Sequence, residues 1–255
     1  MENVVLFLGY IFIVGTAGSG KSTLTDALAD YIAANGLTCH TMNLDPGVRW
    51  LPYYPDVDVR EYVNYEDVMT KLNLGPNGGL IACTDMIAEW TTRLKEEAEE
   101  GSPDYILVDT PGQMEIFAFR SAGPHIIRSL ADHKSMILYL FDPFLSKTST
   151  GFVSVLLLSV SIQYRFFLPQ LNVLSKTDMV SREDVERILG WTQNYDMLLD
   201  AIEKEAGGTV GEINTALCHL LGTMSTLSGL IPTSAVKADG LDLLYTEIDR
   251  ILQEL

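Results

Sequence analysis

The sequence predicts an α/β fold built on a mainly parallel β-sheet with helices on both faces. Short apolar segments alternate along the chain with longer segments of helical period, which is the pattern of repeated β–α units. The segment at 135–141 is almost continuously apolar, as expected for a strand that is covered on both faces. Right-handed crossovers between parallel strands then produce a layered sheet flanked by helices.

The expected elements follow in chain order, bounded by turn and capping signals. We expect strands at Tyr10–Val14, Thr38–Leu44, Tyr105–Val108, Ser135–Phe141, Leu171–Leu174 and Ile231–Ser234. We expect helices at Thr23–Ala34, Glu66–Leu72, Thr84–Glu100, Glu115–Leu130, Ser146–Phe167, Arg182–Thr226 and Leu241–Leu252. Thr84 and Ser181 are candidate N-caps, and Gly151 interrupts the helix at 146–167. Residues 49–60, rich in Pro, Tyr and Asp, are expected to form an irregular loop.

The helical segment at 182–229 is expected to provide packing or subunit contacts. Breaks are expected at Gly190 and Gly207-Gly208. Its apolar residues at helical spacing indicate core or a subunit interface rather than a cofactor site, and they are Leu217, Leu220, Leu221 and Met224. His219, beside these residues, is expected to be a packed residue rather than a ligand. Without repeats or a flexible linker, the chain is expected to form one domain over residues 1–255.

Composition limits the classes of partner. The 255 residues are 47% hydrophobic, which is ample for a buried core, and the net charge of −17 opposes sequence-independent binding to nucleic acid. Three separate cysteines show no zinc-site spacing and indicate a reducing, cytoplasmic setting. The apolar segment at 4–14 lacks a basic start and runs into a functional loop, and the segment at 153–168 is too polar and short to span a bilayer. We therefore expect no targeting peptide and no membrane partner.

A glycine-rich turn between the first strand and the first helix carries the clearest chemistry. It reads Gly15, Thr16, Ala17, Gly18, Ser19, Gly20, Lys21, Ser22, and it matches G-x-x-x-x-G-K-[ST] at every fixed position. Glycines allow backbone N–H groups to turn toward phosphate oxygens, and the positive end of the helix, beginning at Thr23, points to the same place. Lys21 would reach the β- and γ-phosphates, and Ser22 would ligate Mg²⁺. The turn is a phosphate-binding loop.

A second motif follows the strand at 105–108. Asp109 stands at its carboxyl end, where a carboxylate can ligate Mg²⁺ or accept from magnesium-bound water. Gly112 can bring its N–H close to a γ-phosphate because it has no Cβ. Asp45 ends the preceding strand at the same edge of the sheet and either faces the phosphates or begins a turn before Pro46. With the phosphate-binding loop, these motifs predict a three-layer phosphate-loop NTPase fold.

The strand at 171–174 ends in a tetrapeptide that suggests a guanine-binding site. Ser175-Lys176-Thr177-Asp178 resembles the N-K-x-D motif of GTPases, with Ser in place of Asn. A carboxylate at Asp178 can accept two N–H groups of guanine, whereas adenine would face it with a lone pair, at a cost of about 1–3 kcal/mol. Ser234-Ala235, at the end of the last strand, matches the second base-contacting loop of GTPases. A Lys-Thr-Asp turn before a capped helix is the alternative interpretation of 175–178.

One further motif separates this chain from ordinary small GTPases. Gly75-Pro76-Asn77-Gly78-Gly79, lying between the phosphate-binding loop and Asp109, is expected to form a sharply turned loop. With the other motifs and the segment Asp56–Glu61, it makes the chain resemble the GPN-loop GTPases from Tyr10 to its carboxyl end.

The resemblance implies a magnesium-dependent GTPase that converts GTP to GDP and acts as a homodimeric switch. Gly75, Pro76 and Asn77 of one subunit would enter the active site of the partner, where Asn77 would approach the γ-phosphate and the attacking water. Gln113 is our first choice for orienting that water, with Glu115 and Asp45 as second choices. Eukaryotic members are linked to RNA polymerase assembly, so a related protein assembly is a partner by analogy alone.

Two other functions fit parts of the pattern. A nucleotide-gated assembly factor would bind GTP and a protein partner with little hydrolysis. An ATP-dependent small-molecule kinase would share the phosphate-binding loop, but it should carry lid arginines, and the Arg-poor stretch at 142–169 does not provide an obvious one.

Overall fold

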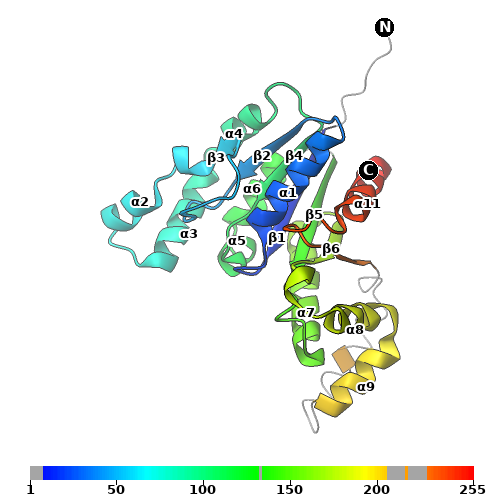
Figure 1. Ribbon diagram of the computed structural model, residues 1–255. Coiled ribbons are helices and arrows are strands. Elements are labelled where there is room, and N and C mark those ends of the chain that lie inside the picture. Colours follow the sequence, from blue (N-terminus) through cyan, green and yellow to red (C-terminus); the bar gives the residue numbers. More distant parts are fainter. Residues whose placement is uncertain (1–7, 132–133, 206–215, 218–228) are drawn as a thin grey trace.

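A seven-stranded parallel sheet forms the centre of the molecule, as the sequence predicts (Figure 1). The computed structural model describes residues 8–131, 134–205, 216–217 and 229–255. The strands, in chain order, are β1 (Gly9–Gly15), β2 (Cys39–Asn43), β3 (Val57–Asp58), β4 (Tyr105–Asp109), β5 (Lys134–Phe141), β6 (Gln170–Leu174) and β7 (Leu230–Pro232). Their spatial order is β3-β2-β4-β1-β5-β6-β7, and every pairing is parallel. All carboxyl ends therefore meet at one edge.

Helices cover both faces of this sheet, which confirms the expected three layers. They are α1 (Lys21–Ala34), α2 (Tyr65–Lys71), α3 (Pro76–Ile87), α4 (Thr91–Ala98), α5 (Met114–Phe119), α6 (Ala122–Leu130), α7 (Ser149–Phe166), α8 (Arg182–Gln193), α9 (Tyr195–Glu205) and α11 (Leu241–Glu254). On one face, α1 and α11 bury Leu28, Ile32 and Ile248 against β1 and β5. On the other, α3 to α7 enclose a core that includes Phe12, Phe117 and Phe141 and continues to α8 and α9.

The segment at 49–60 is more ordered than its composition indicates. It contains β3 and a short 3-10 helix at Val59–Glu61, so the expectation of an irregular loop up to residue 60 is wrong. The Asp56 carboxylate accepts hydrogen bonds from the Thr41 N–H (2.7 Å) and hydroxyl (3.0 Å), and these bonds align the chain beside β2. A two-residue strand held by side chains leaves little periodicity in the sequence.

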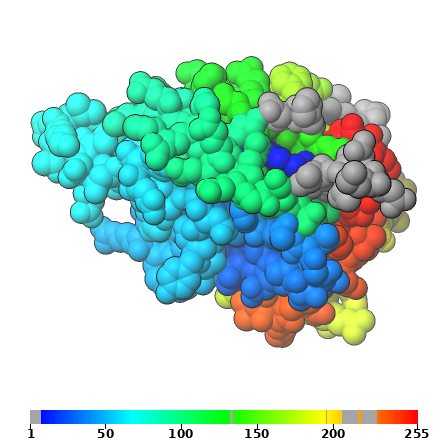
Figure 2. Space-filling view, turned by 90° about the horizontal axis from the view of Figure 1, so that it is seen from above, coloured from blue at the N-terminus to red at the C-terminus, as the bar shows by residue number. Residues whose placement is uncertain are grey.

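The expected sharp loop at 75–79 is instead the beginning of α3. Gly75 is the N-cap residue in an extended conformation, and Pro76 occupies the first turn, where its missing N–H has no helical partner to lose. Gly79 is buried, and a Cβ there would lie 2.3 Å from Cγ of Met69 on α2. The glycine is needed for close packing of α2 on α3, and this helix pair projects from one side of the molecule (Figure 2).

Three expected helix boundaries are also wrong. Thr84 lies inside α3 and donates to the Leu80 carbonyl at 2.8 Å, and the segment to residue 100 is divided into α3 and α4. The helix expected at 115–130 divides into α5 and α6 at Arg120, whose backbone is extended, and the two pack so closely that a Cβ on Gly123 would lie 1.8 Å from the Phe117 carbonyl oxygen. Gly151 does not interrupt α7. It lies in the first turn, and its N–H donates to the Thr148 hydroxyl at 3.1 Å.

The carboxyl-terminal helical segment is described only in part. It divides at Asn194 rather than at Gly190, and Ser181 caps α8 as expected by accepting from the Asp184 N–H. Leu198 and Ile202 of α9 are buried in the core. Gly207-Gly208, Cys218, His219, Leu220, Leu221 and Met224 lie outside the described residues, as does the segment at 4–7. Single-domain organisation and a subunit interface here stay predictions. Among the described helices, none combines the length and apolar character needed to cross a bilayer.

Candidate functional site

The carboxyl edge of the sheet brings most of the predicted site residues together. The register pairs Ile13 of β1 and Asn43 of β2 with Asp109 of β4, so the phosphate-binding loop, Asp45 and Asp109 follow three neighbouring strands. Ser175 and Ser234 follow β6 and β7 on the other side of β1 and β5. Asn77 is the exception: it is exposed in the first turn of α3 and makes no hydrogen bond to the loop at 15–22 among the described residues.

The phosphate-binding loop has the conformation that its glycines allow. Gly18 and Gly20 have φ angles of 75° and 96°, in the left-handed region that residues with a Cβ avoid. Gly20 is the N-cap residue of α1, so the N–H groups of the first helical turn are directed into the loop. At Gly15 a Cβ would lie 2.6 Å from the Ser19 hydroxyl oxygen, which is too close for any other residue without a shift. The loop forms a cradle for an anion.

Lys21 folds back over this cradle. Its ammonium donates to the carbonyl oxygens of Gly15 (3.1 Å) and Thr16 (3.2 Å), and the side chain is buried. Burial lowers the pKa of Lys21, while the carboxylates of Asp109 and Asp45 act in the opposite direction. The ammonium therefore lies in a desolvated position where phosphate oxygens would replace carbonyl oxygens as acceptors.

Asp109 is the buried acid of the site. It is 2% exposed, and burial raises its pKa to about 6 even though Ser22, Lys21 and Tyr53 act in the opposite direction. Its Oδ2 accepts a hydrogen bond from the Tyr53 hydroxyl at 3.1 Å. Its Oδ1 is buried and has no hydrogen-bond partner among the residues that the structure describes. One carboxylate oxygen therefore has an unused lone pair at the phosphate-binding edge.

These residues fit a magnesium ion held jointly by protein and substrate. Within the described ranges, no group of three or more His, Cys, Asp or Glu side chains forms a complete metal cage. Mg²⁺ in nucleotide sites takes one or two protein ligands and completes its shell with phosphate oxygens and water. The unpartnered Oδ1 of Asp109 and the Ser22 hydroxyl near it are ligands of this kind.

Asp45 and Gly112 contact each other at this edge of the sheet. For Asp45 the sequence leaves two roles open, facing the phosphates or beginning a turn before Pro46, and for Gly112 it predicts an N–H close to a γ-phosphate. Asp45 Oδ2 accepts from the Gly112 N–H at 3.0 Å, and Oδ1 accepts from the Gly47 N–H at 2.9 Å. Buried Asn43 fixes the Asp45 backbone, since its amide donates to the Asp45 carbonyl (3.2 Å) and its carbonyl accepts from the Asp45 N–H (3.0 Å). The Asp45 carboxylate thus accepts the hydrogen bond of the Gly112 N–H, for which the sequence predicts a γ-phosphate as partner.

The other candidates for orienting water lie at the start of α5. Gln113 is the N-cap residue of that helix and Glu115 is in its first turn, and both are exposed. The Glu115 carboxylate is close enough to raise the pKa of the buried Tyr139 hydroxyl, although burial of Tyr139 is the larger cause. Gln113, Glu115 and Asp45 are therefore all near the edge, and their roles stay predictions.

A cavity beside the phosphate-binding loop carries the expected base-reading residues. Its lining includes Gly20, Leu24, Lys176, Asp178, Thr233 and Ala235. Buried Ser234 donates to Asp178 Oδ1 at 2.7 Å and so fixes the carboxylate. Ser175 also lines the cavity, and its hydroxyl donates to the Ser19 carbonyl (2.8 Å) and the Phe141 carbonyl (3.1 Å). Ser175 thus ties the base-reading loop to the phosphate-binding loop.

Lys176 forms one wall of that cavity. Its ammonium donates to the Gly18 carbonyl and forms an ion pair with Asp142 at 2.9 Å, while its carbons would contact a Cβ built on Gly20. The Lys176 side chain is 25% exposed and that of Asp142 is 10% exposed, and this partly buried ion pair holds Lys176 across the loop. Asp142 was missed by sequence reasoning, and its position directly after β5 at the same edge is the signal that could have revealed it.

Gly75, Pro76 and Asn77 make no polar contact with the phosphate-binding loop among the residues that the structure describes. All three are exposed at the start of α3, and the Tyr65 hydroxyl donates to the Pro76 carbonyl at 2.9 Å. No hydrogen bond or ion pair in the described part of the chain joins 75–77 to 15–22. Their side chains are therefore available to another molecule.

The glycine cradle, its buried lysine, the Asp at the end of a neighbouring strand and the base cavity together define a phosphate-loop nucleoside triphosphatase. Comparison with known proteins narrows this class. A family model described as "conserved hypothetical ATP binding protein" matches residues 13–254. GPN-loop GTPase 3 of Eremothecium gossypii is 31% identical over 249 residues, which cover 95% of this chain and 91% of that protein. The chain belongs to the GPN-loop GTPase family.

Two further comparisons agree with this assignment and confirm the resemblance. GPN-loop GTPase 1 of Dictyostelium discoideum is 31% identical over 247 residues, which cover 96% of this chain, and the chain spans 61% of that longer protein. The crystal structure of a GTPase from Pyrococcus abyssi in apo form superimposes with a TM-score of 0.85 at 30% identity, covering 95% of this chain and 96% of that one.

Proposed function

We propose that this chain is a magnesium-dependent GTPase that acts as a homodimeric switch, with Gly75–Asn77 of each subunit entering the active site of its partner. The observation that carries the proposal is the meeting of three groups at one edge of the sheet: the anion cradle, the buried Asp109 and the Asp178–Ser234 pair. They match the phosphates, the cation and the base of one nucleotide.

The phosphates are bound by the loop at 15–22. Its N–H groups and the amino end of α1 supply positive potential. Lys21 exchanges its bonds to two loop carbonyls for the β- and γ-phosphate oxygens. Ser22 and Asp109 hold Mg²⁺, which neutralises charge on the transferred phosphoryl group when bound.

Selectivity for guanine depends on Asp178. The Ser234 hydroxyl occupies one side of Oδ1 and leaves acceptor sites on the carboxylate for N1–H and N2–H of guanine. Adenine presents a lone pair at N1, so the carboxylate would lose a partner. Ser175 has its hydroxyl hydrogen on backbone carbonyls, which supports a role in holding the loops together.

Hydrolysis requires a positioned water molecule, for which the partner's Asn77 and this chain's Gln113, Glu115 and Asp45 are the candidates. An exposed amide on a projecting helix pair can reach a second copy of the chain. An amide both donates to phosphate and accepts from water, so it can orient an in-line attack. The Gly112 N–H is released to the γ-phosphate when Asp45 moves away from it.

The first test is phosphate release from GTP and from ATP, with and without Mg²⁺, across protein concentration. Magnesium-dependent release that favours GTP supports the proposal. Tight GTP binding with negligible phosphate release would instead support a nucleotide-gated assembly factor. Turnover of ATP that requires an added acceptor supports a kinase and contradicts the proposal.

A complementation experiment tests the entry of Asn77 into the partner's site. Lys21→Ala and Asn77→Ala chains are each expected to lack activity. In a mixed dimer, the site with intact Lys21 receives Asn77 from the other chain, so mixing restores turnover. If Asn77 acted within its own subunit, neither site of the mixed dimer would be complete and mixing would restore nothing.

A further inference from the structure

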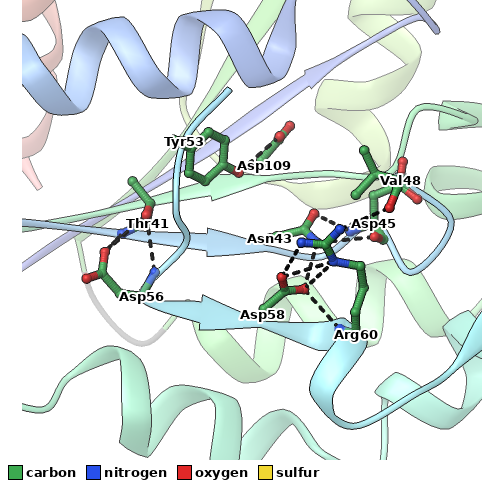
Figure 3. Close-up of polar contacts among 9 residues, drawn as sticks. All are labelled: Thr41, Asn43, Asp45, Val48, Tyr53, Asp56, Asp58, Arg60 and Asp109. Atoms are coloured by element: carbon green, nitrogen blue, oxygen red, sulfur yellow. Dashed lines mark hydrogen bonds and ion pairs between the residues drawn. The ribbon is translucent and has the colours of Figure 1, made fainter. Parts of the chain in front are cut away.

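The loop between β2 and β3 contributes a side chain that the phosphate motifs do not include. Tyr53 extends from this loop to the end of β4, and its hydroxyl donates to Asp109 Oδ2 at 3.1 Å (Figure 3). The two other aromatic side chains of the loop face solvent: Tyr54 is 100% and Trp50 is 75% exposed. Tyr53 alone in this stretch is partly buried with its polar atom on a site carboxylate.

One end of the loop is fastened by an arginine. Arg60 donates to the Val48 carbonyl at 3.1 Å and holds Asp58 through its Nε at 2.9 and 3.0 Å. Asp58 also accepts from the Asn43 amide at 2.9 Å, so the cluster is joined to the end of β2 (Figure 3). A guanidinium bound by two oxygens of one carboxylate has a defined orientation. The chain at residue 48 therefore has a fixed position.

The other end is fastened by Asp56. Its carboxylate accepts from the Thr41 N–H and hydroxyl, and its N–H donates to the Thr41 carbonyl at 2.9 Å. The anchor at 48 is a bond to Arg60 in the 3-10 helix after β3, and the anchor at 56 is a set of bonds to Thr41 of β2; neither involves Tyr53. The position of the loop is thus set without the Tyr53 hydroxyl, and that hydroxyl donates its hydrogen bond to Asp109.

We propose that Tyr53 is a positioning residue that holds the Asp109 carboxylate with Oδ1 directed to the cation of the bound nucleotide. The inference rests on the proposed function, since it assumes that Mg²⁺ accompanies GTP. Tyr53 satisfies Oδ2, and Oδ1 is the buried oxygen without a partner in the described residues. A phenol donates a hydrogen bond without adding positive charge, so the carboxylate keeps its negative charge for the cation.

Partners of this kind around a metal ligand fix its orientation, and their loss typically costs about 10–100-fold in metal affinity. The test is equilibrium binding of a fluorescent GDP analogue to full-length wild type, Tyr53→Phe and Tyr54→Phe chains, titrated with Mg²⁺ and measured also in EDTA. Tyr54→Phe is the matched control, because it removes a hydroxyl from the adjacent exposed ring. Tyr53→Phe is expected to raise the Mg²⁺ concentration at half-saturation by about 10-fold and to leave nucleotide affinity in EDTA unchanged.

The outcomes separate this inference from the proposed function. A wild type chain whose nucleotide affinity does not respond to Mg²⁺ contradicts the proposed magnesium dependence, and the inference with it. If the wild type responds and Tyr53→Phe has the same half-saturation as Tyr54→Phe, the inference alone is overturned. Equal loss of affinity with Mg²⁺ and in EDTA would also overturn it, because Tyr53 would then support the fold rather than the metal ligand.

Discussion

Replacing Asp109 by Asn should stabilise the nucleotide-free protein at neutral pH, although it removes a proposed metal ligand. Asp109 is 2% exposed and burial raises its pKa to about 6 from the ordinary 3.8, so folding disfavours the ionised carboxylate. Asn has nearly the same shape, carries no charge, and can still accept the hydrogen bond from Tyr53. The substitution therefore removes the cost of burying the charge.

The sign follows from the direction of the pKa shift. Because the folded-state pKa lies above the unfolded value, the carboxylate destabilises the fold at pH above about 6, and this cost disappears below pH 3.8. The raised pKa amounts to about 3 kcal/mol at pH 7.5 and to about half of that at pH 5. For a chain of this size, these values correspond to melting-temperature gains of roughly 6–12 °C and 3–6 °C.

The assay is thermal unfolding in EDTA without nucleotide, at pH 5 and pH 7.5. Asp85→Asn is the matched control, because Asp85 is exposed on α3 and its substitution removes the same charge from an acidic protein. The stability gain of Asp109→Asn over Asp85→Asn should increase with pH. An equal gain at both pH values, or a loss of stability at pH 7.5, would refute the argument that the buried charge is costly.

The structure predicts the effect of four other substitutions. Ser234→Ala removes the 2.7 Å donor to Asp178, so GTP affinity should fall by about 3–10-fold in equilibrium binding while ATP affinity changes little; equal losses would contradict a base-orienting role. Gly20→Ala introduces a Cβ at φ 96° in the phosphate-binding loop, which costs about 1–2 kcal/mol and should weaken binding of both nucleotides, as isothermal titration would show. Gly240→Ala places a Cβ 2.2 Å from the Pro232 carbonyl oxygen and should lower the free energy of unfolding by about 2 kcal/mol or more in urea. Gly36→Ala, at φ 81° with open space around it, should cost only about 1 kcal/mol.

The central strands and the order of elements could be predicted because their signal is local. β1 and β5 are continuous apolar segments, and burial of both faces follows from that pattern. The α2–α3 hairpin could not be predicted in the same way. Gly75 to Gly79 has the composition of a turn, but the contact of Gly79 with Met69 and Tyr65 decides that these residues begin a helix. That contact joins residues 10 to 14 positions apart, beyond the range of a turn signal.

The same difference between local and long-range signals separates the site residues that could be predicted from those that could not. Lys21, Asp109 and Asp178 could be predicted because fixed spacing and position after a strand place them at one edge of the sheet. Tyr53 could not, because its partner lies 56 residues away and its position depends on the anchors Arg60 and Asp56. Asp58 and Arg60 carry opposite charges two residues apart, which is a weak indication that they pair with each other. This spacing does not predict their bonds to Asn43 and Val48.

The pKa shifts of Lys21 and Asp109 support a site that is arranged to bind a phosphate chain together with a cation. Lys21 and Asp109 are both buried, and burial shifts each pKa toward the neutral form: it lowers that of Lys21 and raises that of Asp109. Each charge is therefore only partly compensated by the other. A phosphate chain would supply negative charge to Lys21, and a divalent cation would supply positive charge to Asp109. Binding of both ligands compensates the free-energy cost of burying the charges of Lys21 and Asp109. Nucleotide and Mg²⁺ should therefore bind with positive cooperativity, each increasing the affinity for the other by the same factor.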